Sequence, residues 1–472
     1  MPVIYHLGKS GVMFKNIIKV LLSNLTLTMI GLANSIIFPI ILNIGDYAYY
    51  QEYMLYVSYI NICHLGIASG MFLNYSGKEY ESIEKKRYKS EIYLICLALC
   101  FFTIIGFGLY FFYHNKMILF VTLTIIPHCI IASFLALYQA FGNFTKYAVI
   151  NVFPKLVLSI LIITGCLFGH IITGSNVISI NIIAVFLTLV FIMLEFRKFT
   201  AGVKSSQLFS KENMITLSNG FLITLGNYIN LLFHSIDKQY VNIFFEVKAF
   251  ATYSFAMSMQ SIMMIFITSL ANPIYVRMSS ETMDNIFVKR MKELLFMFGA
   301  YSGCAYFAVA YVIKNYITKY FDSIIIIRLF FAVFPAMAVI NILYINLYKS
   351  KRKIKKYIMV LIAVLVIAAL LNGIVILANL DYPMIAFATM VTYYVWLVYS
   401  QRDFEEINIT RNDILYLVGF LIIYFGGSTI ENEVVGFVLY AIIITAWNIL
   451  SYKKALIYVI DKIRLDHHIH IR

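Results

Sequence analysis

Charged residues are scarce in this sequence of 472 residues. They make up 13% of the chain, whereas 61% of the residues are hydrophobic, and the mean hydropathy is +0.84. Soluble globular proteins carry about 25% charged residues, and a soluble chain this apolar would expose hydrophobic patches far larger than such proteins tolerate. The composition therefore excludes a soluble globular fold.

Short alternating segments bounded by turns, the signature of a membrane β-barrel, are also missing. Apolar runs of about 20 residues recur instead, the length that a helix needs to cross hydrocarbon, where helices satisfy their own backbone polar groups. We therefore predict an all-α polytopic membrane protein with about fourteen spans. The predicted spans are 16–42, 53–73, 92–113, 117–141, 148–169, 177–194, 214–233, 252–275, 294–312, 324–344, 358–377, 383–399, 414–426 and 434–450.

The net charge is +14. Its distribution along the chain is that of a membrane protein rather than that of a nucleic-acid-binding protein. With the N-terminus placed inside, few basic residues fall on outside loops. They are Lys116, Lys238, Lys248, Lys314 and Lys319. Arg328 lies within a span, and all other lysines and arginines fall on the inside. This bias predicts an even number of spans with both termini cytoplasmic, and it leaves no basic patch for nucleic acid.

Motifs for catalysis or metal binding are lacking too. The GKS at 8–10 is no phosphate loop, because Val3 stands where that motif needs a glycine. The DHHIH at 466–470 is read as a solvated tail, and all six cysteines lie in apolar spans as small hydrophobic residues. The first apolar run lacks a cleavage site and is long enough to span the membrane, so we expect no cleavable signal peptide. We expect neither an enzyme nor a bound cofactor.

One hydrophilic connecting segment, which we call a joint, occurs twice in the sequence. LYQAFGNFTKY at 137–147 connects spans four and five, and LYKSKRKIKKY at 347–357 connects spans ten and eleven. An offset of six spans keeps the same orientation, so the sequence predicts a parallel duplication. We expect a six-span N-lobe at 1–200, a cytoplasmic linker at 201–213, a six-span C-lobe at 214–400, and spans thirteen and fourteen with a cytoplasmic tail at 401–472. The longest expected outside loop, 234–251, leaves no room for an extracellular domain.

Two basic residues stand inside apolar spans, where an ionisable group is costly and by default marks a pathway. Arg328 lies in IIIIRLFFAVF, and Lys155 follows a helix-distorting proline in NVFPKLVLSIL. Each is either a cation in a cavity that attracts an anionic group such as a pyrophosphate, or a long side chain that snorkels to an interface. The residues themselves leave both interpretations open.

Span seven has a polar side. Asn219, Asn227, Asn230, His234 and Asp237 fall within an arc of about 80° on a helical wheel. The stripe indicates a cavity wall in which Asp237 and His234 carry a proton, or hydrogen bonds between helices. Two weaker signals lie in spans one and two. They are Asn24 with Thr28, Gly31 and Ser35, and Asn61 with His64.

Several segments resemble a known family. They are NIGDYAYYQEYMLYVSYINICHLGIASGMFLNYSGK at 43–78, LYQAFGNFTKYAVINVFPKL at 137–156, HSIDKQYVNIFFEVKAFATYSFAMSM at 234–259 and SLANPIYVRMSSE at 269–281. These segments are similar to the polysaccharide flippases of the multidrug/oligosaccharidyl-lipid/polysaccharide exporter superfamily, most closely the Wzx-type O-antigen flippases.

The resemblance implies two six-helix lobes around a central cavity, with spans thirteen and fourteen as an addition. It also implies translocation of undecaprenyl-pyrophosphate-linked oligosaccharide across the bacterial inner membrane by alternating access, driven by a proton or sodium gradient. A polysaccharide polymerase and a chain-length regulator would be protein partners. On this interpretation Arg328 and Lys155 contact the pyrophosphate, the asparagines contact sugar hydroxyls, and Asp237 and His234 couple the ion.

Three alternatives remain. A drug/cation antiporter of the same superfamily would favour acidic residues in its cavity, whereas the deep charges in this chain are mainly basic. A lipid II flippase shares the span count and a cationic cavity, although the first span of this chain is not rich in arginine. A membrane-embedded polymerase or glycosyltransferase would need a long outside loop or a soluble catalytic domain.

Overall fold

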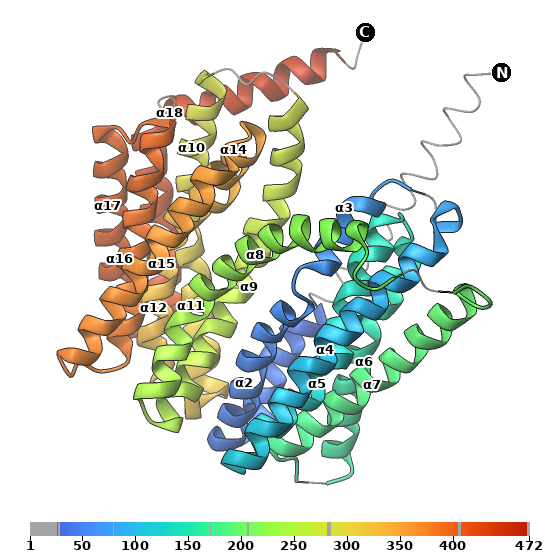
Figure 1. The fold of residues 1–472 in the computed structure, drawn as a ribbon. Coiled ribbons are helices and arrows are strands. Elements are labelled where there is room, and N and C mark those ends of the chain that lie inside the picture. The colour runs from blue at the N-terminus through green and yellow to red at the C-terminus, as the bar shows by residue number, and fades with distance from the viewer. Residues whose placement is uncertain are drawn as a thin grey trace. The chain divides into compact units, whose positions relative to one another are not determined.

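A computed structural model of the protein describes residue 26 and residues 29–78, 80–169, 171–204, 207–280, 285–404 and 407–469 (Figure 1). These residues form helices, turns and bends, and none of them lies in a β-strand. The predicted all-α fold is confirmed.

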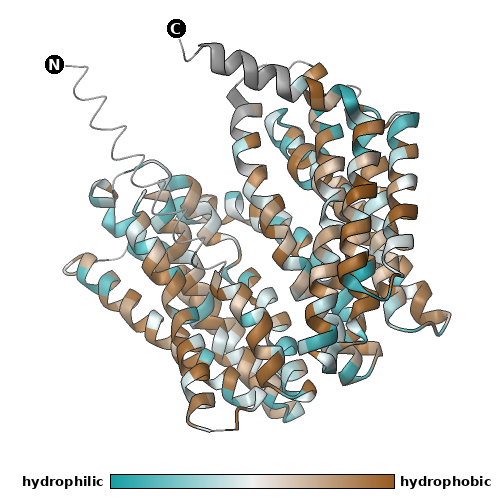
Figure 2. Cartoon of the chain, turned by 180° about the vertical axis from the view of Figure 1, so that it is seen from behind, coloured by the Kyte–Doolittle hydropathy of each residue, from teal (hydrophilic) through white to brown (hydrophobic). Residues whose placement is uncertain are grey.

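Nine helices in the described part of the chain are long and apolar enough to cross a membrane, or 11 if two bent helix pairs each count as one span. The bent pairs are Ile44–His64 with Ile67–Tyr75, and Ser323–Ala332 with Phe334–Ser350. The other predicted spans also contain helices, namely Met29–Ile41, α8 (Lys211–Phe244) and α17 (Arg411–Gly427). Hydrophobic residues run along the helices (Figure 2), so the chain is a polytopic membrane protein.

The chain packs as two units, Met1–Leu232 (unit 1) and Phe233–Arg472 (unit 2). Unit 1 contains Met29–Ile41, α2 (Ile44–Tyr59), η1 (Ile60–His64), α3 (Ile67–Tyr75), η2 (Tyr80–Ser82), α4 (Lys85–Tyr113), α5 (Lys116–Ala140), α6 (Phe144–Leu167) and α7 (Gly174–Phe199). Unit 2 contains α9 (Val247–Ser280), α10 (Asn285–Ala300), α11 (Ser302–Tyr316), η3 (Thr318–Tyr320), α12 (Ser323–Ala332), α13 (Phe334–Ala338), η4 (Val339–Tyr344), α14 (Ile345–Ser350), α15 (Ile354–Leu377), α16 (Pro383–Ser400), η5 (Gln401–Asp403), α17 and α18 (Glu433–Ile469). The boundary falls within α8, downstream of 201–213, and the division into lobes at that linker stays a prediction.

The part of α8 up to Leu232 belongs to unit 1, and its backbone closely approaches that of α3. The helical path is interrupted between η1 and α3 at Leu65 and Gly66, whose φ angles are 51° and 88°. A Cβ at Gly220 of α8 would overlap the Gly66 carbonyl, and a Cβ at Gly70 would overlap the Thr216 carbonyl. Small residues therefore let the two helices approach closely, as is common between membrane helices.

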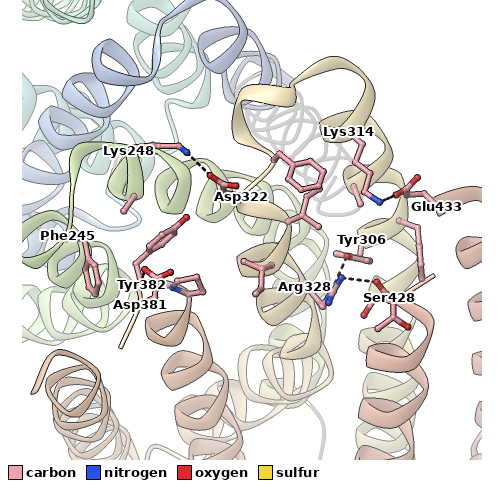
Figure 3. A pocket seen from close by; sticks show the side chains of 18 of the residues that line it. Phe245, Lys248, Tyr306, Lys314, Asp322, Arg328, Asp381, Tyr382, Ser428 and Glu433 are labelled. Atoms are coloured by element: carbon pink, nitrogen blue, oxygen red, sulfur yellow. Dashed lines mark hydrogen bonds and ion pairs between the residues drawn. The ribbon is translucent and has the colours of Figure 1, made fainter. Parts of the chain in front are cut away.

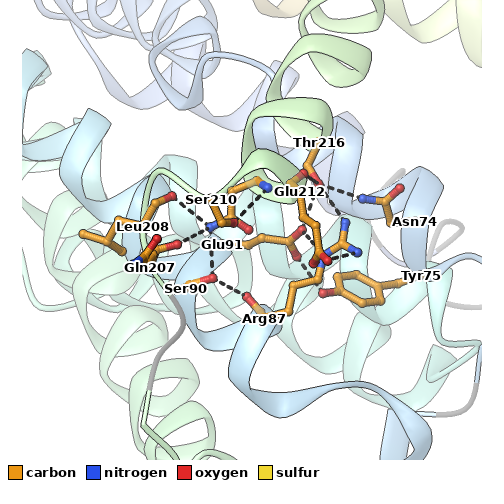
Figure 4. Close-up of polar contacts among 11 residues, drawn as sticks. Asn74, Tyr75, Arg87, Ser90, Glu91, Gln207, Leu208, Ser210, Glu212 and Thr216 are labelled. Carbon is orange, nitrogen blue, oxygen red and sulfur yellow. Dashed lines mark hydrogen bonds and ion pairs between the residues drawn. The ribbon is translucent and has the colours of Figure 1, made fainter.

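A polar cluster reinforces this contact (Figure 4). Glu91 of α4 is fully buried, and its carboxylate accepts hydrogen bonds from the Tyr75 hydroxyl (2.6 Å), the Thr216 hydroxyl (2.9 Å) and Arg87 Nε (3.1 Å). A buried carboxylate is tolerated when it is paired and hydrogen-bonded in this way.

Helices α8 and α9 are longer than the predicted spans seven and eight. Residues 234–251 were expected to form a loop, but only Phe245 and Glu246 separate the two helices, so that expectation is wrong. Polar residues made this stretch resemble a loop. The helix continues because the most costly of them, Asp237, has buried hydrogen-bonding partners within unit 2.

The first of the repeated joints links α5 to α6. Gly142 adopts a left-handed conformation (φ 67°), and the Asn143 amide donates to the Tyr138 carbonyl (2.8 Å), a common way to end a helix. The Tyr138 hydroxyl donates to Glu195 of α7 (3.0 Å), and Lys146 forms an ion pair with the same carboxylate.

The second joint, between α14 and α15, repeats each of these features. Arg352 is left-handed (φ 55°), and the Lys353 amide donates to the Tyr348 carbonyl (2.8 Å). The Tyr348 hydroxyl donates to Asp403 of η5 (2.8 Å), and Lys356 pairs with Asp403 (3.0 Å). The tyrosine and lysine common to both sequences thus bind a carboxylate at the end of a later helix in the same unit.

The last two helices are anchored in unit 2 by a buried ion pair. Lys292 of α10 lies 2.6 Å from Asp413 of α17, and both side chains are almost fully buried. The Tyr452 hydroxyl of α18 donates to the same carboxylate (2.7 Å), and the Tyr440 hydroxyl donates to the Ala300 carbonyl (2.6 Å). Helices α17 and α18 are therefore packed into unit 2.

We expect the two joints to respond alike to mutation. Glu195→Gln and Asp403→Asn each weaken charge-assisted hydrogen bonds from tyrosine and lysine, so each should reduce the free energy of unfolding by roughly 1 kcal/mol. Thermal unfolding of the detergent-solubilised protein measures this. Glu81→Gln, at an exposed carboxylate, is the matched control. Joint variants that unfold at the same temperature as the control would contradict the stabilising role.

Candidate functional site

The largest of the four cavities described below lies within unit 2 and has a volume of about 1110 Å³. Four turns contribute to its walls: those between α8 and α9, η3 and α12, α15 and α16, and α17 and α18. The predicted topology places all four turns on the outside, so we call this the outer cavity.

Arg328 lines the outer cavity and is held by neutral groups. Its Nε donates to the Tyr306 hydroxyl (3.3 Å), and its Nη2 donates to the Ser428 carbonyl (2.9 Å). The guanidinium carbon lies 6.0 Å from the centre of the Tyr306 ring, within the range of a cation–π interaction. Tyr424 fixes the backbone by donating to the Arg328 carbonyl (3.0 Å). Among the described residues, no carboxylate pairs with this arginine.

The two lysines of the outer cavity are neutralised, unlike the arginine (Figure 3). Lys248 lies 2.8 Å from Asp322, and Lys314 forms an ion pair with Glu433. Tyr382 also lines the cavity. Burial raises the pKa of its phenol to about 12, and the carboxylates of Asp322 and Asp381 add to this shift. The phenol is therefore protonated at neutral pH and is available as a donor.

Lys155 lines a cavity of about 490 Å³ within unit 1, which we call the Lys155 cavity. Helices α2, α5, α6, α7 and Met29–Ile41 form its walls. Its polar lining comes from Asn34, Ser35, Gln51, Thr124, His128, Asn151 and Asn181. Among the described residues that line this cavity, Lys155 is the one lysine or arginine, and none is an aspartate or glutamate.

The position of Lys155 follows from the local sequence. Pro154 cannot donate a backbone hydrogen bond and distorts the turn before it, and both residues line the cavity. One turn further on, the Ser159 hydroxyl donates to Asn34 Oδ1 (3.0 Å), which ties α6 to the helix Met29–Ile41. Within the described ranges, Lys155 has no ion-pair partner. The arrangement can bind an anion next to neutral hydrogen-bonding groups.

Asp237 lines a smaller cavity, of about 240 Å³, within unit 2. It is 6% exposed. Its Oδ1 accepts a hydrogen bond from Asn372 Nδ2 (2.7 Å), and its Oδ2 accepts one from the Thr389 hydroxyl (2.6 Å). Both donors are neutral, so no cation in the described part of the chain balances this carboxylate. It can take up either a proton or a metal cation.

Two further groups lie beside this carboxylate. His234 lines the same cavity, with its Nδ1 3.4 Å from the Tyr393 hydroxyl. Asn372 is fully buried, and its Oδ1 has no hydrogen-bond partner among the described residues. Asp237 and His234, both candidates from the sequence, thus line the same cavity, while their role in coupling stays a prediction.

The remaining candidates are spread over unit 1. Asn61 and Asn227 line a cavity of about 680 Å³. Asn219 and Asn230 line none of the four cavities, and Asn24 lies outside the described residues. A single continuous polar wall along span seven stays a prediction.

Several polar residues of these sites were missed by sequence reasoning. Asn372 and Thr389 contact Asp237, and Asn151 and Asn181 line the Lys155 cavity. The available signal was a lone asparagine in an apolar helix, as in LLNGIVI around Asn372. Such residues are common in helix bundles and often only join helices, so the signal is weak without the fold.

No protein-family model and no curated protein sequence matches the chain. Among solved structures, the chain is similar to one described as the lipid II flippase MurJ in an inward closed conformation. The TM-score is 0.69 at 13% sequence identity, over 93% of this chain and 100% of that chain. At this identity the likeness establishes the fold: the chain is an all-α polytopic membrane protein with the architecture of that flippase structure.

Proposed function

We propose that the protein is a flippase that moves undecaprenyl-pyrophosphate-linked oligosaccharide, an O-antigen or related repeat unit, across the bacterial inner membrane. Both termini lie in the cytoplasm. Translocation proceeds by alternating access and is coupled to an ion gradient. The protein is a transporter rather than an enzyme.

The observation that carries this proposal is the Lys155 cavity. A charge within apolar helices is costly and persists where it has a use, and this lysine faces neutral polar groups instead of a carboxylate. A pyrophosphate supplies the missing negative charge. The neighbouring asparagines and glutamine offer donors and acceptors for sugar hydroxyls, while a polyprenyl tail remains in lipid.

Asp237 is the coupling site of this proposal. This buried carboxylate is held by two neutral donors and has no countercharge among the described residues, so it binds a proton or a sodium ion from solution. Binding in one conformation and release in the other would link the ion gradient to the cycle.

Lipid II is the second candidate substrate, and the similar solved structure supports it because it is described as a lipid II flippase. A drug/cation antiporter is disfavoured, because a lone lysine repels cationic drugs. The two lipid-linked substrates are separated by complementation. One bacterial strain lacks its O-antigen flippase and the other is depleted of its lipid II flippase. Restored surface polysaccharide in the first strain, without rescue of the second, supports our proposal.

Removing the charge of Lys155 should impair translocation. Lys155→Gln keeps a polar side chain of similar length but cannot attract pyrophosphate, so surface polysaccharide in the complemented strain should fall at least about tenfold, the loss expected for one charge-assisted contact. Lys155→Arg should retain most activity. Lys116→Gln, which removes an exposed lysine of the same unit, is the control at matched membrane expression. Full activity of Lys155→Gln would contradict the proposed role.

Neutralising Asp237 should uncouple transport from the ion gradient. Asp237→Asn preserves the size of the side chain but carries neither a titratable proton nor a negative charge. In proteoliposomes, an imposed proton or sodium gradient should accelerate the wild type and leave this variant unaffected. Whichever gradient stimulates the wild type identifies the ion. Glu81→Gln should respond like the wild type, and gradient stimulation of Asp237→Asn would refute the assignment.

A further inference from the structure

The outer cavity of unit 2 has a charge balance that differs from that of the Lys155 cavity. Three basic and five acidic side chains line it. The two lysines are already paired with Asp322 and Glu433, which leaves Arg328 as the cation and Glu246, Asp381 and Glu431 as additional carboxylates. A ligand with several negative charges, such as pyrophosphate, would be repelled by these three groups. A ligand with a single negative charge would meet one free guanidinium.

The guanidinium of Arg328 is held in place and still has N–H donors that a ligand can use. Nε and Nη2 are used by Tyr306 and Ser428, whereas Nη1 has no hydrogen-bond partner in the described part of the chain. The Tyr306 side chain and the Ser428 carbonyl hold the guanidinium, so little side-chain freedom is lost on binding. A planar, preorganised fork of this kind suits a carboxylate.

Aromatic and hydrogen-bonding groups line the same cavity as this arginine. Phe321 is 55% exposed and lines the cavity with Phe245 and Tyr382, whose rings meet edge to face with centroids 6.2 Å apart. Asp381 Oδ1 accepts the Tyr382 amide (2.8 Å). Apolar rings with a few placed polar groups are typical of small-molecule sites. A sugar ring matches them, because it has an apolar C–H face and a rim of hydroxyls.

We propose that the outer cavity binds an acidic sugar, with its single carboxylate on Arg328 and its ring against the exposed aromatic side chains. This deepens the proposed function and rests on it: the bound sugar is part of the oligosaccharide that the flippase translocates. The carboxylates at the outer cavity accept sugar hydroxyls and exclude polyanions.

Binding of soluble probes to the full-length protein in nanodiscs tests this site without requiring translocation. The probes are glucuronate, glucose, glucosamine and inorganic pyrophosphate, followed by saturation-transfer NMR. We expect glucuronate to bind more tightly than glucose or glucosamine, and an equal concentration of pyrophosphate not to displace it. No detectable glucuronate binding, preference for glucosamine, or displacement by pyrophosphate would each overturn the proposal.

Variants locate the binding. Arg328→Gln should weaken glucuronate binding at least about tenfold, and Phe321→Ala, at an exposed side chain, should weaken it several-fold even if Arg328→Gln destabilises the turn at Ser428. Asp381→Asn should let pyrophosphate compete better. Lys116→Gln is the matched control and should bind like the wild type. Unchanged binding in both Arg328→Gln and Phe321→Ala would overturn the assignment.

Translocation assays distinguish failure of this inference from failure of the proposed function. If the wild type binds glucuronate but complements neither flippase-deficient strain, the proposed function fails while the sugar site stands. If the wild type complements but does not bind glucuronate, the sugar site fails alone. If Arg328→Gln abolishes glucuronate binding yet translocates normally, the cavity binds free sugar, and its assignment to the translocated oligosaccharide is wrong.

Discussion

The cost of placing a charge inside apolar helices governs this structure. A buried charge must be paired, hydrogen-bonded or exposed to water in a cavity. Glu91 is surrounded by Tyr75, Thr216 and Arg87, and Lys292 and Asp413 neutralise each other. These groups join helices. Lys155, Arg328 and Asp237 are different, because they have no ion-pair partner among the described residues and stay available to a ligand or ion that binds and is released.

The two joints meet this constraint in the same way. From the sequence, the shared leucine, tyrosine and lysine positions predicted two equivalent turns, and the structure places a left-handed residue at the same position in each. The carboxylates that bind Tyr138 and Tyr348 could not be predicted. Glu195 and Asp403 differ in residue type and lie far along the chain from their partners. The local sequence predicts the turn, whereas the carboxylate that binds each tyrosine depends on how later helices pack.

The same division holds for the candidate site. Lys155, Arg328 and Asp237 stand out because each is a charge in or beside an apolar run, so sequence alone identified them. Asn372 and Thr389 did not stand out, since neutral polar residues in helix bundles have many uses. The error at 234–251 has a related origin. Polar residues there indicated a loop, but tertiary partners around Asp237 stabilise a helix that composition alone disfavours.

The central claim is that an unpaired lysine in a polar membrane cavity selects a lipid-linked anion. It is tested most directly by reconstituting the purified wild-type protein in liposomes with two fluorescent undecaprenyl lipids. Both carry the same saccharide, one through pyrophosphate and the other through an uncharged ether linkage. The account predicts that the protein accelerates transfer of the pyrophosphate-linked lipid between leaflets and leaves the uncharged lipid at the rate of protein-free liposomes. Equal acceleration of both lipids, or none for the pyrophosphate-linked lipid, would contradict it.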